Sequence, residues 1–271
     1  MAEIRELDIR EPFSSLWRGR DVFACAASLS GKVYRSVKNR RTLRFEEDGK
    51  GYFIKIHGPT SRWELLKNLF QLKMPVFGAE NEYRAIRKLE TLGVSTMTVR
   101  AYASRGSKPC SLESFLVTDE ITGHMSLEDF CRSWAQEPPA SELKHKLIRA
   151  LAETCAKMHF AGVNHRDCYL CHFLLKLDTA NAPMPVLYVI DLHRAQIRKK
   201  VPLRYLVKDI AGLFFSAMDT GITRHDILRF IRIYANRPLR EELKQRNRFY
   251  RNAEHAARKL YIKEFRKNPP L

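Results

Sequence analysis

The spacing of apolar residues changes part-way along the chain, and this change limits the possible folds more than any other feature. Residues 31–57 contain three strand-like segments, GKVYRSVK, RTLRFEED and YFIKIHG, and further strands are expected at 96–103 and 113–119. Asp48-Gly49, between the second and third segments, is typical of a two-residue hairpin turn. From residue 141 onward helical spacing dominates. Strands first and helices afterwards predict an α+β fold with two lobes.

The first lobe, residues 1–120, is expected to hold a five-stranded antiparallel sheet and a helix that carries Glu82. The second lobe, residues 121–271, is expected to be mainly helical, with basic helices at its end. An amphipathic helix is also expected at 62–73, where it faces either a core or lipid.

Three helix boundaries can be placed from capping residues. Gly93 is expected to end the helix that carries Glu82. Two further helices are expected at 126–135 and 141–161, the second with Ser141 as its N-cap and Gly162 as its terminator.

Charge is the outlying quantity in the composition. Lys and Arg number 48 against 30 Asp and Glu, which gives a net charge of +18 over 271 residues. Residues 224–267 alone carry fourteen Lys and Arg against five Asp and Glu. A charge this large attracts polyanions such as nucleic acid, an anionic membrane surface or a phosphorylated substrate. Composition alone is equally consistent with a solvated basic surface that has no single partner.

The sequence also argues against several classes of protein. The first residues, MAEIRELDIREPFSSLW, are charged and lack the apolar core of a secretory signal peptide. No apolar run approaches the roughly 20 residues that a membrane-spanning helix needs. The six cysteines show no disulfide framework, so free thiols in a reducing cytoplasm are expected.

The segment VNHRDCYLCHFLLK, residues 163–176, admits two interpretations. Cys168 to His172 spell C-x-x-C-H, the attachment signature of a c-type haem. His165-Arg166-Asp167, in a loop between a helix and a strand, is close to a kinase catalytic loop. A reducing compartment disfavours haem, and no second C-x-x-C or histidine pair completes a metal site. We therefore expect no haem.

Four charged residues lie where a folded domain rarely places them. Lys55 interrupts an apolar strand, Glu82 lies on a helix, Asp167 is in the loop, and Asp191 ends the apolar segment VLYVI. A lone strand lysine commonly extends its charge to solvent, and a carboxylate at a buried strand end must be paired or bind metal. Their order along the chain is that of a kinase-like site.

Each of the four has a physical role in phosphoryl transfer. A lysine on a rigid strand can hold the α- and β-phosphates, and a glutamate can fix its rotamer. An aspartate at a strand end can bind Mg²⁺, which prefers oxygen ligands. A loop aspartate can accept or orient the proton of the attacking hydroxyl.

Several longer segments carry a more specific likeness, among them MPVFGAENEYRAIRKL, GVNHRDCYLCHFLL, VIDLHRAQIR and KDIAGLFFSAMDTGITRHDILRF. From about residue 11 to residue 245 the sequence resembles the lipopolysaccharide core heptose(I) kinase family of Gram-negative bacteria, which has a protein-kinase-like fold. The resemblance implies an ATP- and Mg²⁺-dependent kinase that phosphorylates the first heptose of the lipopolysaccharide core, at O4. It also implies work at the cytoplasmic, anionic face of the inner membrane, with acyl carrier protein as a possible acidic partner.

The same resemblance assigns roles to the four charged residues. Asp167 corresponds to the catalytic aspartate, Lys55 and Glu82 to the ATP-orienting pair, and Asp191 to the Mg²⁺ ligand. Asp209, which opens the segment DIAGLFF, is expected to brace the catalytic loop.

Three features depart from protein kinases. His172 occupies the position of the second metal-binding asparagine, so it binds either metal or, in place of it, substrate or a water. Asp191 is followed by Leu-His rather than Phe-Gly, and no G-x-G-x-x-G precedes Lys55. Arg40 or Arg41 therefore either contacts phosphates or only faces solvent.

The acceptor is expected to meet basic residues near the metal aspartate. The candidates are His193, Arg194 and Arg198, with Arg166 as a further candidate that has an internal structural role as its alternative. A kinase of the same fold that acts on protein tyrosine or another small molecule remains an alternative. A basic nucleic-acid-binding or scaffold module with a degenerate kinase fold is a third, but the chain retains all four charged residues and lacks an RNA-binding signature.

Overall fold

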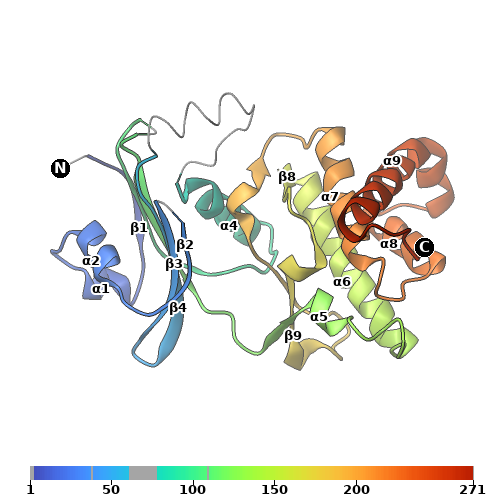
Figure 1. The fold of residues 1–271 in the computed structure, drawn as a ribbon, viewed down its shortest axis with the longest axis horizontal. Helices are drawn as coiled ribbons and strands as arrows, with labels where there is room; N and C mark the ends of the chain where they lie inside the picture. The colour runs from blue at the N-terminus through green and yellow to red at the C-terminus, as the bar shows by residue number, and fades with distance from the viewer. Residues whose placement is uncertain (1–2, 38, 61–77, 109, 271) are drawn as a thin grey trace. The chain divides into compact units, whose positions relative to one another are not determined.

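The computed structural model describes residues 3–37, 39–60, 78–108 and 110–270, so the helix expected at 62–73 lies outside the described residues. Contacts divide the chain into two compact units (Figure 1). The first contains Met1–Lys88 and Met97–Ile121, and the second contains Leu89–Thr96 and Thr122–Leu271. The short segment 89–96 belongs to the second unit, where Val189 forms hydrogen bonds with it. The Thr96 hydroxyl donates to the Val189 carbonyl at 2.7 Å, and the Val189 N–H donates to Ser95 at 2.9 Å.

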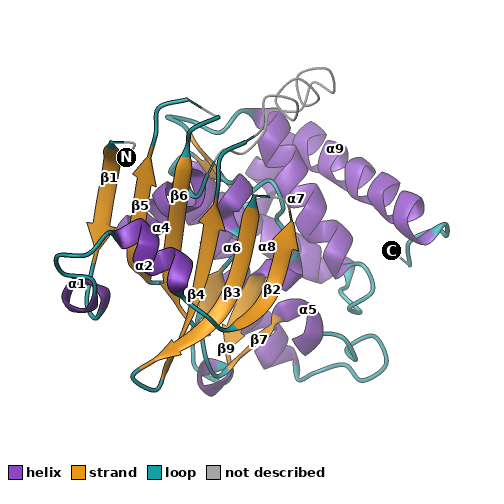
Figure 2. Ribbon diagram, turned by 60° about the vertical axis from the view of Figure 1, so that its left-hand side comes forward, coloured by secondary structure: helices purple, strands orange, loops and turns teal. Residues whose placement is uncertain are grey.

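The first unit is built on a single antiparallel sheet, which has six strands in the described part of the chain rather than the five expected (Figure 2). Their order is β1-β5-β6-β4-β3-β2. The bounds are Ile4–Ile9 for β1, Lys32–Val37 for β2, Arg40–Glu47 for β3, Lys50–His57 for β4, Val99–Arg105 for β5 and Glu113–Asp119 for β6. The additional strand is β1, whose charged sequence IRELDI pairs along β5 and leaves Leu7 exposed.

A two-residue hairpin turn joins β3 to β4, as the Asp48-Gly49 pair predicts. Both residues have positive φ, 49° and 72°, as a type I′ turn requires. The turn fixes the register, so Lys55 in β4 faces Thr42 of β3 on one side and Leu116 of β6 on the other. Lys55 therefore lies on an interior strand that is hydrogen-bonded along both edges.

Helices cover both faces of this sheet. On one face, α1 (Phe13–Leu16) and α2 (Val22–Ser28) enclose an apolar core in which Phe13 packs with strand residues such as Leu43 and Ile54. On the other face lies α4 (Glu80–Thr91), whose Tyr83 stacks on Tyr102 with ring centroids 4.0 Å apart. Because successive strand residues point to opposite faces, Ile54 is buried in the core and Lys55 faces α4.

The second unit is mainly helical. Its long helices are α6 (Ser141–Phe160), α7 (Leu203–Ala217), α8 (Arg224–Ala235) and α9 (Leu239–Phe265). A buried cluster of Ala211, Met218, Ala257 and Tyr261 joins α7 to α9, while α6 packs on α8. No described helix is both long and apolar enough to cross a membrane.

Two helix boundaries differ from those expected. The helix expected at 126–135 is the single turn α5 (Leu127–Phe130), capped by Ser126, and turns follow it. The N-cap of α6 is Ala140 rather than Ser141, and no side chain caps this helix. Gly162 does follow the end of α6, with φ of 85°.

Short strands frame the loops that carry the acidic residues. β7 (His124–Ser126), β9 (Phe173–Lys176) and β10 (Leu187–Val189) form a small antiparallel sheet. β8 (Val163–Asn164) pairs with β11 (Gln196–Ile197). Asp167 follows β8, and Asp191 follows β10, so both carboxylates are set at the ends of hydrogen-bonded strands.

Candidate active site

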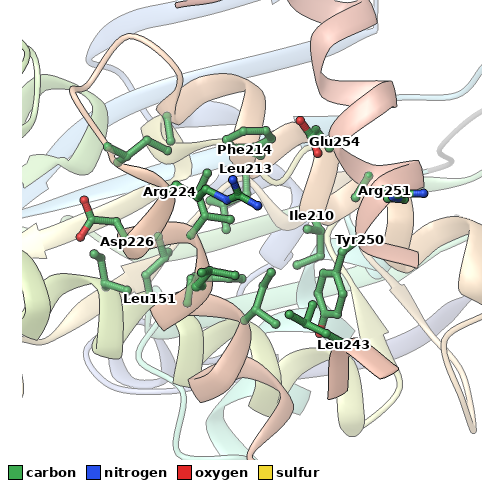
Figure 3. A pocket seen from close by; sticks show the side chains of 18 of the residues that line it. Leu151, Ile210, Leu213, Phe214, Arg224, Asp226, Leu243, Tyr250, Arg251 and Glu254 are labelled. Atoms are coloured by element: carbon green, nitrogen blue, oxygen red, sulfur yellow. The ribbon is translucent and has the colours of Figure 1, made fainter. Parts of the chain in front are cut away.

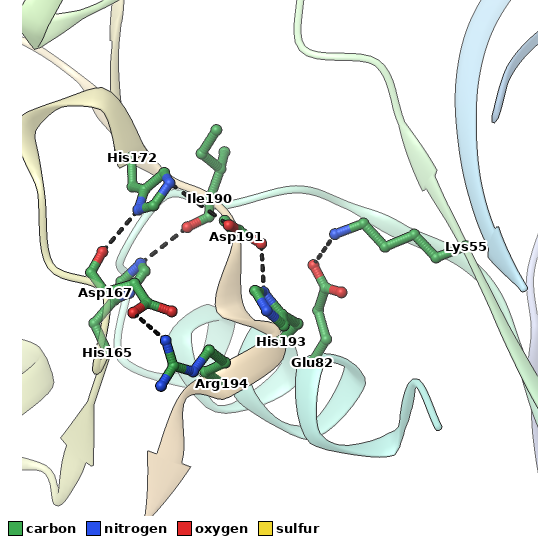
Figure 4. Close-up of polar contacts among 9 residues, drawn as sticks. All are labelled: Lys55, Glu82, His165, Asp167, His172, Ile190, Asp191, His193 and Arg194. Carbon is green, nitrogen blue, oxygen red and sulfur yellow. Dashed lines mark hydrogen bonds and ion pairs between the residues drawn. The ribbon is translucent and has the colours of Figure 1, made fainter. Parts of the chain in front are cut away.

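In the first unit, Lys55 and Glu82 form a close ion pair (Figure 4). The ammonium of Lys55 donates to Oε1 of Glu82 at 2.6 Å. The Glu82 side chain is only 1% exposed, whereas that of Lys55 is 28% exposed. A buried carboxylate thus holds the ammonium of a lysine that is still partly exposed, so the rotamer of Lys55 is fixed and its charge remains accessible to an anion.

In the second unit, Asp209 of α7 holds the loop that contains Asp167. Its two carboxylate oxygens accept the backbone N–H groups of His165 at 2.6 Å and Arg166 at 2.8 Å. Asp209 is 1% exposed, so these bonds form away from water, where an unpaired carboxylate is costly. This agrees with the bracing role expected for Asp209.

The brace continues into the helical core. His159 of α6 lies with Nε2 3.3 Å from Asp209 Oδ2 and with Nδ1 2.9 Å from the hydroxyl of Tyr234. His159, Asp209 and Tyr234 are all buried, so three helices, α6, α7 and α8, meet at one polar network. Such a fully bonded network favours one arrangement of the loop over others.

One residue beside each acidic side chain of the site, or the acidic residue itself, has an uncommon backbone conformation. Arg166 has φ of 74° and Asp191 has φ of 58°, in the left-handed region that L-residues rarely adopt. Each such residue costs about 1–3 kcal/mol and persists only where its surroundings fix it. For Arg166 the fixing contact is the hydrogen bond to Asp209.

Gly212 allows α7 to approach this loop closely. A Cβ atom at Gly212 would lie 2.8 Å from the carbonyl oxygen of Cys168 and 3.3 Å from the ring of Tyr169. Because Cys168 directly follows Asp167, a side chain here would push on the loop that positions the carboxylate.

Arg194 binds the carboxylate of Asp167 directly. Its Nη1 donates to Asp167 Oδ1 at 2.6 Å, with the Asp167 side chain 16% exposed. The sequence placed Arg194 on the acceptor side; the structure places it on the proposed catalytic carboxylate itself. Arg194 therefore orients Asp167 and leaves its second oxygen, Oδ2, for another contact.

Two histidines flank the carboxylate of Asp191 (Figure 4). His193 Nδ1 lies 2.6 Å from Oδ1, and His172 Nε2 lies 3.5 Å from Oδ2. The other ring nitrogen of His172, Nδ1, is 2.7 Å from the carbonyl oxygen of Asp167. His172 thus links the backbone of the Asp167 loop to the strand-end aspartate.

The His172–Asp191 pair fits a divalent cation. A carbonyl oxygen can only accept, so Nδ1 of His172 carries the proton, and in the neutral ring Nε2 presents its lone pair to Asp191. In the described part of the chain, no group of three His, Cys, Asp or Glu side chains is gathered to hold a metal ion. Water and phosphate oxygens would have to complete the coordination, as is usual for Mg²⁺.

The side chain of His165 makes contacts that the sequence did not reveal. Its Nε2 lies 2.9 Å from the carbonyl oxygen of Ile190, and its ring stacks on that of His172 at 5.5 Å. Burial lowers the pKa of His165, which keeps the ring neutral. His165 therefore joins the Asp167 loop to the residue before Asp191. The only sequence signal for this role was the place of His165 in the His-Arg-Asp triplet. Its partner Ile190 lies 25 residues away along the chain, so the contact could not be read from the sequence.

The cysteines of the C-x-x-C-H match have other surroundings. Cys168 is buried, and its hydrogen bond with Cys155 together with burial raises the pKa of the Cys168 thiol well above its usual value. Burial raises the pKa of Cys171 to about 11. Both thiols therefore favour the protonated form at neutral pH.

The remaining basic candidates lie in two places. Arg198 donates to Asn164 and Gln196, and Arg166 lies half-buried beside Asp167. Arg40 and Arg41 are half-buried at the start of β3 in the first unit. Contact of either with phosphate stays a prediction.

Comparison with known proteins places this geometry in a family. The profile of the lipopolysaccharide kinase (Kdo/WaaP) family matches residues 26–234. The chain belongs to this family. It is 50% identical over 261 residues to the lipopolysaccharide core heptose(I) kinase WaaP of Pseudomonas aeruginosa, covering 96% of this chain and 97% of that protein. It is 48% identical over 238 residues to the WaaP of Escherichia coli K12, covering 88% and 90%.

A solved structure of the Kdo/WaaP family agrees with the fold. The structure described as WaaP in complex with acyl carrier protein has a TM-score of 0.83 and 47% sequence identity, covering 94% of this chain and 99% of that one. The expected family and the expected kinase-like α+β fold are therefore both confirmed.

Replacing Gly212 by alanine tests whether α7 holds the loop through close contact. Alanine is favoured over glycine in a helix by about 1 kcal/mol, but overpacking costs about 1–3 kcal/mol. We expect Gly212→Ala to lower the melting temperature, because the opposing atom is backbone. As a matched control, Asn252→Ala on the exposed side of α9 should leave it unchanged or slightly raised. A stabilised Gly212→Ala protein would contradict the close contact.

Proposed function

We propose that this protein is an ATP-dependent kinase that phosphorylates the first heptose of the lipopolysaccharide inner core, at O4. The observation that carries the proposal is the Asp167 carboxylate, oriented by Arg194 on a loop that Asp209 holds. Relatives 50% and 48% identical over most of the chain are named heptose(I) kinases, which supports the sugar acceptor over protein tyrosine.

In the chemical step one proton is transferred, one oxygen–phosphorus bond forms and another breaks. The heptose hydroxyl donates to Asp167 Oδ2 and passes its proton to this carboxylate as the oxygen attacks the γ-phosphorus of ATP. A new oxygen–phosphorus bond forms, the bond to the β–γ bridging oxygen breaks, and ADP leaves with that electron pair. Arg194 keeps Oδ1 engaged, so the proton goes to the other oxygen.

The nucleotide would be held by the ion pair and by a cation. Lys55, its rotamer fixed by Glu82, would bind the α- and β-phosphates. Asp191 and His172 would hold Mg²⁺, which when bound neutralises charge on the β- and γ-phosphates. His193 donates to the other oxygen of Asp191 and so sets the orientation of that carboxylate.

The acceptor would meet the basic residues around Asp167. Arg166 adjoins the carboxylate in sequence, and Arg198 directly follows β11 and donates to Asn164 of β8, the strand that leads into the loop. The inner core carries acidic groups, so these guanidiniums would favour its binding.

Replacing Asp167 by asparagine tests the catalytic assignment. The amide keeps the shape but cannot accept the proton, so kcat for transfer to deacylated core oligosaccharide should fall by at least about 10²-fold, while KM for ATP changes less than about twofold. The measurement is transfer from labelled ATP. Asp178→Asn is the matched control, because that side chain is 68% exposed and paired only to Lys176 in the described chain. Near-normal turnover by Asp167→Asn would contradict the proposal.

Acyl carrier protein is the partner that we propose for the helical unit. A cavity of about 720 Å³ lies among α6, α7, α8 and α9, and its walls are mostly apolar (Figure 3). Leu151, Leu213 and Phe214 line it, with Arg224 and Arg251 among its charged lining residues. An acidic carrier with an acyl chain matches both features. The solved structure with 47% identity is described as a complex with this carrier.

Charge reversal on this lining tests the carrier proposal. Arg251→Glu should weaken binding of acylated acyl carrier protein by at least about tenfold in a titration calorimeter, because it turns attraction into repulsion. Arg20→Glu, an exposed change in the first unit, should leave binding unchanged. Equal loss in both variants would mean that net charge alone drives the contact, and no loss in Arg251→Glu would contradict the assigned surface.

We further propose that the protein works peripherally at the cytoplasmic face of the inner membrane. Its acceptor is anchored in lipid, and a net charge of +18 favours an anionic surface.

A further inference from the structure

Two arginines of the second unit lie together near the start of α7 without meeting a carboxylate. These are Arg198 and Arg204, and neither forms an ion pair with any residue that the structure describes. Three arginines of the sheet in the first unit, in contrast, each pair with an acid: Arg44 with Glu120, Arg100 with Asp119 and Arg105 with Glu113. The guanidiniums of Arg198 and Arg204 have no such carboxylate in the part of the chain that the structure describes.

Tyr205 organises both arginines. The guanidinium carbons of Arg198 and Arg204 lie 4.7 Å and 4.8 Å from the centroid of its ring. Arg204 also donates to the Tyr205 hydroxyl at 3.2 Å. The two positive guanidiniums around one phenol ring repel each other. This repulsion costs free energy unless it is offset by attraction to the ring or to a bound anion.

Neutral groups hold the guanidinium of Arg198 in place. It donates to Asn164 Oδ1 at 2.8 Å and to Gln196 Oε1 at 2.7 Å. Asn164 and Gln196 face each other across the β8–β11 ladder. Amide oxygens fix the direction of the guanidinium but leave its charge unneutralised, so little further ordering is needed to bind an oxyanion.

Arg198 connects this pair of arginines to the reaction site, because its partner Asn164 lies on β8, the strand that leads into the Asp167 loop. The hydrogen bond from Arg204, followed by the charges of nearby arginines, lowers the pKa of the Tyr205 hydroxyl. Together with the stacking of both guanidiniums on the Tyr205 ring, this indicates one region of positive potential.

We propose that Arg198 and Arg204, arranged around Tyr205, form an oxyanion subsite that binds a carboxylate or phosphate group of the acceptor. The anionic group that the subsite binds lies beside the sugar that receives the phosphate. The subsite therefore favours acidic acceptors and lowers their KM. The identity of the acceptor rests on the proposed function, whereas oxyanion binding at Tyr205 does not.

Kinetic variants test the specificity role. Arg204→Gln removes one guanidinium, and Tyr205→Leu removes the ring on which two are stacked. Each should raise KM for core oligosaccharide at least about tenfold while kcat and KM for ATP change less than twofold. Tyr205→Phe keeps the ring and should stay within about threefold of wild type. Arg149→Gln, an exposed change on α6 with the same loss of charge, should have no effect. Unchanged KM in Arg204→Gln and Tyr205→Leu would overturn the specificity role.

Two acceptor preparations separate the sources of the anion. One is dephosphorylated and keeps the carboxylates of its acidic sugars, and the other keeps its phosphates but has the carboxylates converted to amides. KM is measured for each preparation with wild type and with Arg204→Gln. The preparation whose KM still rises about tenfold in Arg204→Gln carries the group that the subsite binds. Equal insensitivity of both preparations would contradict the subsite.

Binding can be followed without catalysis. In intact protein with ¹³C-labelled tyrosine, inorganic phosphate or a free acidic octulosonate sugar should raise the pKa of Tyr205, because the bound anion offsets the arginines. Arg204→Gln should abolish the response, with its melting temperature as the check on folding. An unmoved Tyr205 resonance in wild type would overturn the subsite even if sugar phosphorylation is observed. A response without sugar phosphorylation would retain the subsite and reject the proposed function.

Discussion

The buried carboxylate of Asp209 is the interaction on which the second unit depends. It accepts two consecutive backbone N–H groups of the loop and also contacts His159, so one side chain ties the loop to two helices. Without it, each buried N–H would lose its partner at a cost of about 1–3 kcal/mol. The positive φ of Arg166 would also lose its support. The position of Asp167 is therefore a consequence of α7, although Asp209 itself is not proposed to touch the acceptor.

A second chain of contacts joins the loop to the strand-end aspartate. His165 reaches the carbonyl of Ile190, and His172 reaches both the backbone of Asp167 and the carboxylate of Asp191. In protein kinases an asparagine stands where this chain has His172. Here the histidine can serve as a structural link and, through Nε2, as a ligand. The substitution keeps a connection between the two acidic residues while changing the chemistry of the contact.

Two kinds of partner hold the basic side chains near the proposed site. Glu82 is buried against Lys55, and Asp167 pairs with Arg194, so these two cations meet carboxylates. Arg198 and Arg204 are instead held by amide oxygens, a hydroxyl and an aromatic ring. Like charges placed close together repel each other, so two guanidiniums on one ring point to binding of an anion rather than to a contribution to folding.

Sequence reasoning reached the order of most elements and the Asp48-Gly49 turn, because periodicity and turn chemistry are local signals. The bracing by Asp209 was expected only from the resemblance to the kinase fold. Sequence reasoning missed β1, whose charged residues hide a strand that forms only by pairing with β5. It extended α5 too far, because Cys131 and Trp134 are buried at helical spacing although turns, and not a helix, carry them. It also placed Arg194 on the acceptor, because contact with Asp167 across 27 residues depends on tertiary structure. Local patterns identify which residues are unusual, and only the fold decides which of them meet.

Mass spectrometry of core oligosaccharide from cells tests the central claim, that the braced loop exists to place Asp167 against a heptose hydroxyl. The gene is deleted and then replaced by wild type, Asp167→Asn or Asp178→Asn at matched protein levels. We expect the phosphate on the first heptose with wild type and Asp178→Asn, and its loss with Asp167→Asn. A first heptose that is phosphorylated in the deletion strain, or in the Asp167→Asn strain, would contradict the account.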